Sequence, residues 1–140
     1  MSREANAAAQ KRFGEAVNSG RLDDIREVVA GHVVDHDPAP DQGPGPEGFI
    51  AFFTTLRTAF PDLAIAVEQQ VADDEQIAFA YTLTGTHRGD FMGIAPTGRA
   101  ISARGLQISR FEHGKLVERW GSSDELGILR QLGVEPAPAG

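Results

Sequence analysis

Residues 63–84 read LAIAVEQQVADDEQIAFAYTLT, and this stretch decides the fold. Apolar side chains recur there at every second position, first from Leu63 to Val67 and again from Ile77 to Leu83. A period of two is typical of strands with one buried face. The acidic run 73–75 separates the two patterns and indicates a turn. We therefore expect two consecutive strands here.

The chain before residue 63 follows the helical period instead. Three helices are predicted, over residues 3–18, about 21–29, and from near Pro46 to Pro61, which ends the third. Residues 32–36 are expected to be extended. The proline- and glycine-rich run 37–46 cannot continue a regular element and is predicted to be a surface loop.

The chain after residue 84 returns to strands and ends in a helix. The expected elements are a crossover from Thr86 to Gly98, strands at about 100–111 and 116–120 joined at His113-Gly114, and a helix over 124–132 with Ser122 or Ser123 as N-cap. Helices followed by an antiparallel meander indicate an α+β fold, with helices on the concave face of a bent sheet. We expect one domain over residues 1–133 and a flexible tail over 134–140.

Composition narrows the class of function. The chain has 140 residues, a net charge of −7 and no cysteine, which excludes disulfides, thiolate catalysis and cysteine-bound metal. The acidic balance disfavours nucleic acid as a partner. No apolar stretch is long enough to span a bilayer, and the charged start of the chain lacks the apolar core of a signal peptide. A cytoplasmic protein without a membrane partner is expected.

Several kinds of site are missing their motifs. The sequence has no glycine-rich dinucleotide motif, no phosphate-binding loop with its lysine, and no nucleophile elbow. His32 and His36, with Asp35 and Asp37 beside them, have a conceivable metal spacing. Because the segment is expected to be extended, the two imidazoles would stand about 13 Å apart, and we predict no metal site.

Two polar residues stand out as candidates for chemistry. Asp124 precedes the last helix, where it is either an N-cap or a general acid or base at a pocket mouth. Gln107 shares its strand face with small residues from Ala103 to Ser109, which leaves space for a ligand or for a closely packed helix. Arg104 lies on the opposite face, and a bulge at Gly105 would exchange the two faces. The alternation therefore leaves open which face points inward.

Longer motifs resemble those of SnoaL-like proteins. They are GTHRGDFMGIAPTGR at 85–99, GKLVERW at 114–120, DELGILRQLG at 124–133, and the region from GPEGF at 45–49 to AFPDL at 59–63. The resemblance covers nearly the whole chain from the first helix to Gly133. It implies the cone-shaped α+β barrel of the nuclear-transport-factor-two-like superfamily.

The resemblance also implies a reaction. The best-known members close the last ring of anthracycline-type polyketides by an intramolecular aldol condensation without metal or organic cofactor, and their acid/base aspartate aligns with Asp124. The cyclases carry a histidine where this chain has Gln107 and an asparagine about where it has His36. Members without that histidine are assigned to hydroxylation of polyketide rings. This departure favours the hydroxylase-like branch slightly over the aldol cyclase.

The candidate site combines this resemblance with the positions of the residues in the predicted strands and loops. Asp124, Gln107 and His36 are the predicted catalytic residues, and the predicted substrate-binding residues are Tyr81, His87, Phe91, Met92, Arg104 and Trp120. The partner would be a polycyclic aromatic small molecule. A non-catalytic binder of a hydrophobic ligand and a pure interaction module are the alternatives. A homodimer or higher homo-oligomer through the open sheet face is expected in each case.

Overall fold

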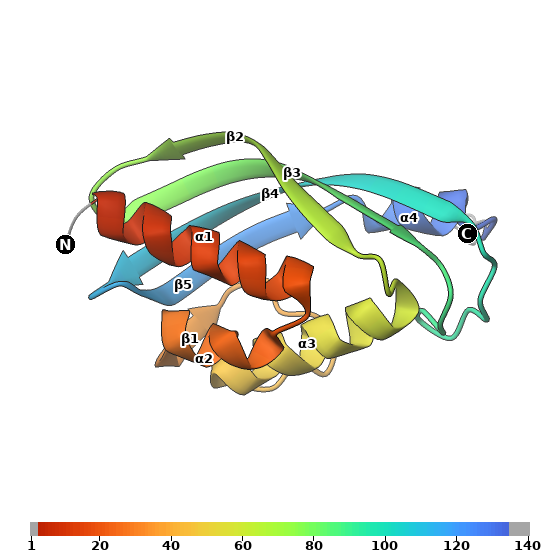
Figure 1. Cartoon of the computed structure of the whole chain (residues 1–140), viewed down its shortest axis with the longest axis horizontal. Helices are drawn as coiled ribbons and strands as arrows, with labels where there is room; N and C mark the ends of the chain where they lie inside the picture. Colours follow the sequence, from red (N-terminus) through yellow and green to blue (C-terminus); the bar gives the residue numbers. More distant parts are fainter. Residues whose placement is uncertain (1–2, 135–140) are drawn as a thin grey trace, which may run out of the picture.

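The computed structural model describes residues 3–134. All of its helices except the last come early in the chain, before the antiparallel strands (Figure 1). The helices are α1 (Arg3–Ser19), the short η1 (Leu22–Asp24), α2 (Ile25–Val28), α3 (Gly45–Ala59) and α4 (Glu125–Gln131). Gly20, at a φ of 83°, ends α1 in a conformation that glycine adopts without strain. Helix α3 begins after Pro44 and carries Pro46 in its first turn, where a missing N–H removes no helical bond.

The strands form one bent sheet that lies over α1, α2 and α3 (Figure 1). They are β1 (Val29–Asp35), β2 (Ala64–Ala72), β3 (Gln76–Thr86), β4 (Ala100–Glu112) and β5 (Lys115–Ser123). Their order is β1-β5-β4-β3-β2, with β1 parallel to β5 and the other pairs antiparallel. The sheet of the described residues is not closed, because β1 and β2 remain its edges. The expected α+β class, with helices on the inner face of a curved and mostly antiparallel sheet, is confirmed.

Strand β4 shows which face of the sheet points inward. Ile101, Ala103, Gly105, Ser109 and Phe111 are buried toward the helices, and the intervening residues face outward. The bulge in this part of the sheet does not lie at Gly105. It interrupts the pairing of β4 with β5 after Arg110, where both Leu116 and Val117 are buried. The face that carries Gln107 is therefore the inner face.

The observed boundaries differ from the expected ones at three strands. Strand β1 begins at Val29, inside the expected second helix, because it pairs with β5 far along the chain. Strand β2 runs on to Ala72, because a bulge after Val67 shifts its alternation. Strand β5 runs on to Ser123, so that neither expected serine caps the last helix.

The last helix, α4, is held in place by hydrogen bonds to β4. The Gln131 side chain donates to the Ser102 carbonyl at 2.9 Å and accepts from the Ser102 N–H at 2.7 Å, which holds α4 against β4 beyond the end of β5. The predicted flexible tail lies, apart from Val134, outside the described residues. Over residues 3–134, no helix has the length and apolar character needed to cross a membrane.

Candidate active site on the inner face

Polar side chains meet on the inner face where β4, β5 and β1 lie side by side. Arg119 Nε donates to Gln107 Oε1 at 2.8 Å, and Arg119 Nη1 donates to Asp35 Oδ1 at 2.9 Å. Gln107 Nε2 donates in turn to Ser109 Oγ at 3.0 Å. Strand register explains the meeting, because Arg119 pairs with Ser109 on one side and with Asp35 on the other. These four residues, Asp35, Gln107, Ser109 and Arg119, are called the inner polar cluster below.

Asp35 is the anchor of this cluster. Its side chain is only 8% exposed, and a carboxylate that is buried needs charged or hydrogen-bonding partners. Besides Arg119, its oxygens accept from the Asp37 N–H and from Gln42 Nε2, each at 3.0 Å. Asp35 thus holds both the guanidinium of Arg119 and the loop that follows β1.

Two glycines make room for two large polar side chains on the inner face. The Tyr81 ring lies over Gly105, where a Cβ would overlap the Tyr81 hydroxyl. The Arg119 guanidinium lies over Gly121, where a Cβ would stand 2.6 Å from Nη2. The small-residue face is therefore filled in part by Tyr81 and Arg119 themselves.

Tyr81, a predicted substrate-binding residue, stands next to the cluster. Burial raises the pKa of its hydroxyl. The positive charge of Arg119 and a hydrogen bond with the Ser123 side chain lower this pKa in part, and the negative charge of Glu125 raises it further. Because the net shift is upward from a value near 10, this hydroxyl stays protonated at neutral pH. Tyr81 therefore offers a hydrogen-bond donor to the inner face.

Asp124 lies where β5 ends and α4 begins. It is the N-cap of α4, and its Oδ1 accepts from the Gly127 N–H at 2.8 Å. Within residues 3–134, its other carboxylate oxygen has no hydrogen-bond partner. Asp124 is exposed rather than enclosed in an apolar cleft. It follows Ser123, the last residue of the inner row of β5.

His36 and Trp120 lie on the outer face of the sheet. Their rings stack with centroids 4.6 Å apart, and His36 Nε2 lies 2.8 Å from Glu118 Oε2. His36 and then Arg110 hold the pKa of Glu118 below its usual range through their hydrogen bonds. Trp120 pairs with Ile108, which also faces outward. The structure therefore does not bring His36 together with Gln107, because the sheet separates them.

Two more predicted substrate-binding residues point away from the inner face. Arg104 is exposed on the outer face, since β4 alternates without interruption from Ile101. Met92 is 64% exposed at the tip of a turn, where the backbone bridges Phe91 and Ile94. Phe91 itself turns inward and packs edge-on against Phe60, with ring centroids 5.2 Å apart.

His87 is fully buried beyond the end of β3. Its Nδ1 accepts from the Thr97 N–H at 3.2 Å, and its ring packs against Phe60. Backbone bonds to Gly98 and Arg99 fix the same segment. In this position His87 ties down the crossover between β3 and β4.

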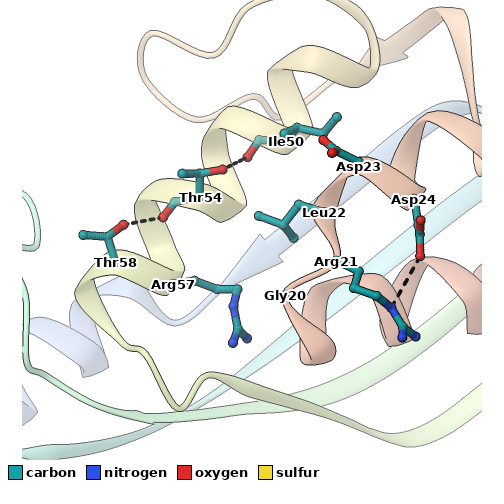
Figure 2. A pocket seen from close by; sticks show the side chains of 9 residues that line it. All are labelled: Gly20, Arg21, Leu22, Asp23, Asp24, Ile50, Thr54, Arg57 and Thr58. Atoms are coloured by element: carbon teal, nitrogen blue, oxygen red, sulfur yellow. Dashed lines mark hydrogen bonds and ion pairs between the residues drawn. The ribbon is translucent and has the colours of Figure 1, made fainter.

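Two hollows open on the surface of the described residues. One, of about 580 Å³, lies between α3 and the turn from α1 into η1, and Figure 2 shows Arg57 beside Gly20 at its edge. Arg57 donates there to the carbonyls of Val17 and Leu63, which joins the helices to the sheet. A second hollow, of about 500 Å³, is lined by the outer-face residues Leu106, Ile108 and Trp120 and also by Gln107 and Gly121. Over the described part of the chain, no three His, Asp or Glu side chains gather as a metal site would require.

Comparison with known proteins assigns this architecture to a family. The family model of SnoaL-like polyketide cyclases matches residues 7–132. The chain belongs to this family. The resemblance that the motifs indicate is confirmed.

The relatives of this SnoaL-like chain include a cyclase, a proposed cyclase and a proposed hydroxylase. It is 34% identical to the aklanonic acid methyl ester cyclase DnrD of Streptomyces peucetius, over 91% of this chain and 90% of that protein. The crystal structure of IdmH, a proposed polyketide cyclase of Streptomyces antibioticus, is 34% identical with a TM-score of 0.80, over 92% and 99% of the two chains. AclR, a proposed hydroxylase of Streptomyces galilaeus, is 29% identical with a TM-score of 0.84, over 97% and 89%.

Sequence reasoning missed Arg119 and considered Asp35 only in connection with a metal site, although the two residues form the centre of the inner polar cluster. One signal was available for Arg119. The alternation of β5 puts it on the same face as Gly121, two positions further on, and a glycine in a strand leaves space for a neighbouring side chain. Nothing local marks Asp35, whose partner is 84 positions away along the chain. Its role depends on the parallel pairing of β1 with β5.

Proposed function

We propose that this SnoaL-like chain is an enzyme that closes a ring of an aromatic polyketide by an intramolecular aldol reaction, with Asp124 as the acid and base. The family and its cyclase relative support the reaction class. The observation that carries the assignment of Asp124 is its second carboxylate oxygen, which has no hydrogen-bond partner within residues 3–134, on a residue that directly follows the inner-row Ser123. A relative that acts on aklanonic acid methyl ester makes a polyketide ester of that kind the first substrate to test.

The proposed steps conserve atoms and electrons. The Asp124 carboxylate removes a proton from the carbon next to a carbonyl, and the enolate carbon attacks a ketone of the same molecule. One carbon–carbon bond forms, and the ketone oxygen becomes an alkoxide. Asp124 then returns its proton to that alkoxide. The product is an isomer of the substrate.

Hydroxylation is the second candidate function. It is favoured by the similarity to AclR and by Gln107, which stands where the resemblance implies a histidine in the cyclases. A glutamine amide can hydrogen-bond a carbonyl or enolate oxygen but cannot carry a proton at neutral pH. A hydroxylase would insert one oxygen atom of dioxygen into its substrate, while two electrons and two protons from an external reductant carry the other oxygen atom to water.

A single assay separates the two functions. We expect the purified protein to convert aklanonic acid methyl ester into an isomer of unchanged mass under strict anaerobiosis, as followed by mass spectrometry and chromatography. A product with an added oxygen, formed only in air, would establish the hydroxylase instead. Binding of the ester without any product, either under anaerobiosis or in air with an added two-electron reductant, would contradict both.

We also propose that a second copy of the chain covers the outer sheet face. Leu106 and Ile108 are exposed there and line a mainly apolar hollow, and Val71 is exposed on β2. An exposed apolar sheet face of this kind favours association of two identical faces. Sedimentation velocity should give a dimer for the wild type and a monomer for Leu106→Glu. Leu126→Glu, an equally drastic change on exposed α4, should remain dimeric, and a monomeric wild type would refute the interface.

A further inference from the structure

Every acceptor oxygen on the side chains of the inner polar cluster already accepts a hydrogen bond from another protein group. Both Asp35 oxygens accept from protein groups, namely Arg119, the Asp37 N–H and Gln42. Gln107 Oε1 accepts from Arg119 Nε. The groups of these side chains that have no hydrogen-bond partner within residues 3–134 are therefore donors.

Gln107 has its amide orientation fixed by its neighbours. Because Arg119 is purely a donor, it binds the amide oxygen, and the amide nitrogen then points to Ser109. One N–H of that nitrogen bonds to Ser109 Oγ, and the second N–H has no partner within the described residues. Gln107 is half-buried, so this N–H lies at the boundary between the core and solvent.

Arg119 supplies further free donors. Its Nε and Nη1 are bonded to Gln107 and Asp35, whereas Nη2 has no hydrogen-bond partner over residues 3–134. Nη2 lies over Gly121, whose missing side chain leaves the space that the guanidinium occupies. The Arg119 side chain remains 19% exposed, so a ligand can reach it. Asp35 fixes the direction of the guanidinium through Nη1 and leaves Nη2 free.

We infer that Arg119 and Gln107 together bind an anionic oxygen of the ligand, which in the proposed aldol reaction is the enolate oxygen of the substrate. This inference rests on the proposed function for the identity of that oxygen. A set of free donors, beside acceptor oxygens that protein groups already engage, matches an oxygen that carries negative charge. Donors held in place by a protein stabilise such an oxygen most when the charge develops during the reaction.

The two residues then have complementary roles. Arg119 provides charge and two N–H groups on Nη2, and it holds the Gln107 amide so that its nitrogen faces the ligand. Gln107 adds one neutral N–H. This division gives Gln107 a part in stabilising the enolate that requires no transfer of its own proton. It separates the stabilisation of the enolate from the proton transfer assigned to Asp124.

Binding of two probes that differ only in charge tests the inference without turnover. The probes are anthraquinone-2-carboxylate and the neutral 2-(hydroxymethyl)anthraquinone, and their binding is measured by titration calorimetry. We expect the wild type to bind the carboxylate at least about tenfold more tightly than the alcohol. The double variant Arg119→Gln/Asp35→Asn removes both charges of the pair and should lose this preference while still binding the alcohol.

Two further variants sharpen the test. Arg110→Gln removes another strand arginine that is ion-paired with a carboxylate, on the outer face, and should keep the preference. Arg119→Lys keeps the charge but not the fork, and should keep part of the preference. With the polyketide ester, the double variant should lose about 10²-fold in kcat, the usual effect of removing an oxyanion donor.

Defined outcomes overturn the inference. Equal binding of the two probes by the wild type, or a carboxylate preference that survives in the double variant, would exclude Arg119 as an anion donor. Loss of both probes together in a folded double variant would show a packing role instead. Failure of the wild type to convert any ester would refute the proposed function, whereas the probe preference would still test the donor set.

Discussion

Replacing Asp35 by alanine should lower the free energy of unfolding by about 3 kcal/mol. The substitution leaves the guanidinium of Arg119 in a mostly buried position without its carboxylate, and breaking a buried pair from one side costs about 3–5 kcal/mol. We expect the lower end of this range, because Arg119 keeps its bond to Gln107 and a weaker one to the Asp37 carbonyl. Equilibrium unfolding in urea measures the difference.

Asp23→Ala provides a matched control for that result. Asp23 accepts from Arg26 Nη1 at 2.9 Å, the same distance as in the pair of Asp35 with Arg119, but its side chain is 85% exposed. An exposed ion pair of this kind contributes about 0–1 kcal/mol, so the control should unfold almost as the wild type does. Equal effects of the two substitutions would show that burial does not determine the strength of the Asp35 pair.

The double variant Arg119→Gln/Asp35→Asn completes the comparison. It removes both charges and keeps amide groups that can still hydrogen-bond, so it should be more stable than Asp35→Ala. This difference in stability is what makes the double variant suitable for binding experiments. A double variant less stable than Asp35→Ala would contradict this reasoning. It would mean that the unpaired Arg119 cation is not the main cause of the stability loss in Asp35→Ala.

The element types could be predicted from the sequence because they depend on local periodicity. The alternation from Ile77 to Leu83 and the helical stripe between Pro46 and Pro61 each repeat often enough to identify their element. The His113-Gly114 turn was also recoverable, since both residues adopt positive φ as a tight hairpin requires. The curved sheet with helices on its inner face follows from this order of elements.

The position of the side chains relative to the sheet could not be predicted in the same way. Whether Gln107 or Arg104 faces inward depends on where the bulge lies, and a bulge leaves no reliable local mark. His36 and Trp120 lie on the outer face because β1 pairs in parallel with β5, a contact between distant segments. Asp124 is the opposite case, because its place before the last helix is a local property that the sequence does reveal.

Replacing Asp124 by asparagine should lower kcat for ring closure by about 10²-fold or more and leave the fold intact. General acid–base catalysis by one side chain contributes about 10²–10⁴-fold, and an amide cannot take up the proton that the carboxylate removes. Asparagine caps a helix as well as aspartate does, and its oxygen can still accept from the Gly127 N–H. Steady-state kinetics with the polyketide ester and urea unfolding should therefore give a large loss of rate with nearly unchanged stability.

Glu125→Gln is the control that assigns this loss to one carboxylate. Glu125 is the next residue along the chain, is also exposed, and lies close enough to Tyr81 for its charge to raise the pKa of that hydroxyl. If Asp124 is the acid and base, Glu125→Gln keeps most of the activity. Asp124→Asn should also keep the preference for the anionic probe, because proton transfer and anion binding belong to different side chains. Full activity of Asp124→Asn with a large loss in Glu125→Gln would move the acid and base one position along the chain, into the first turn of α4. Full activity of both variants would remove this carboxylate pair from the mechanism and confine Asp124 to its role as a helix cap.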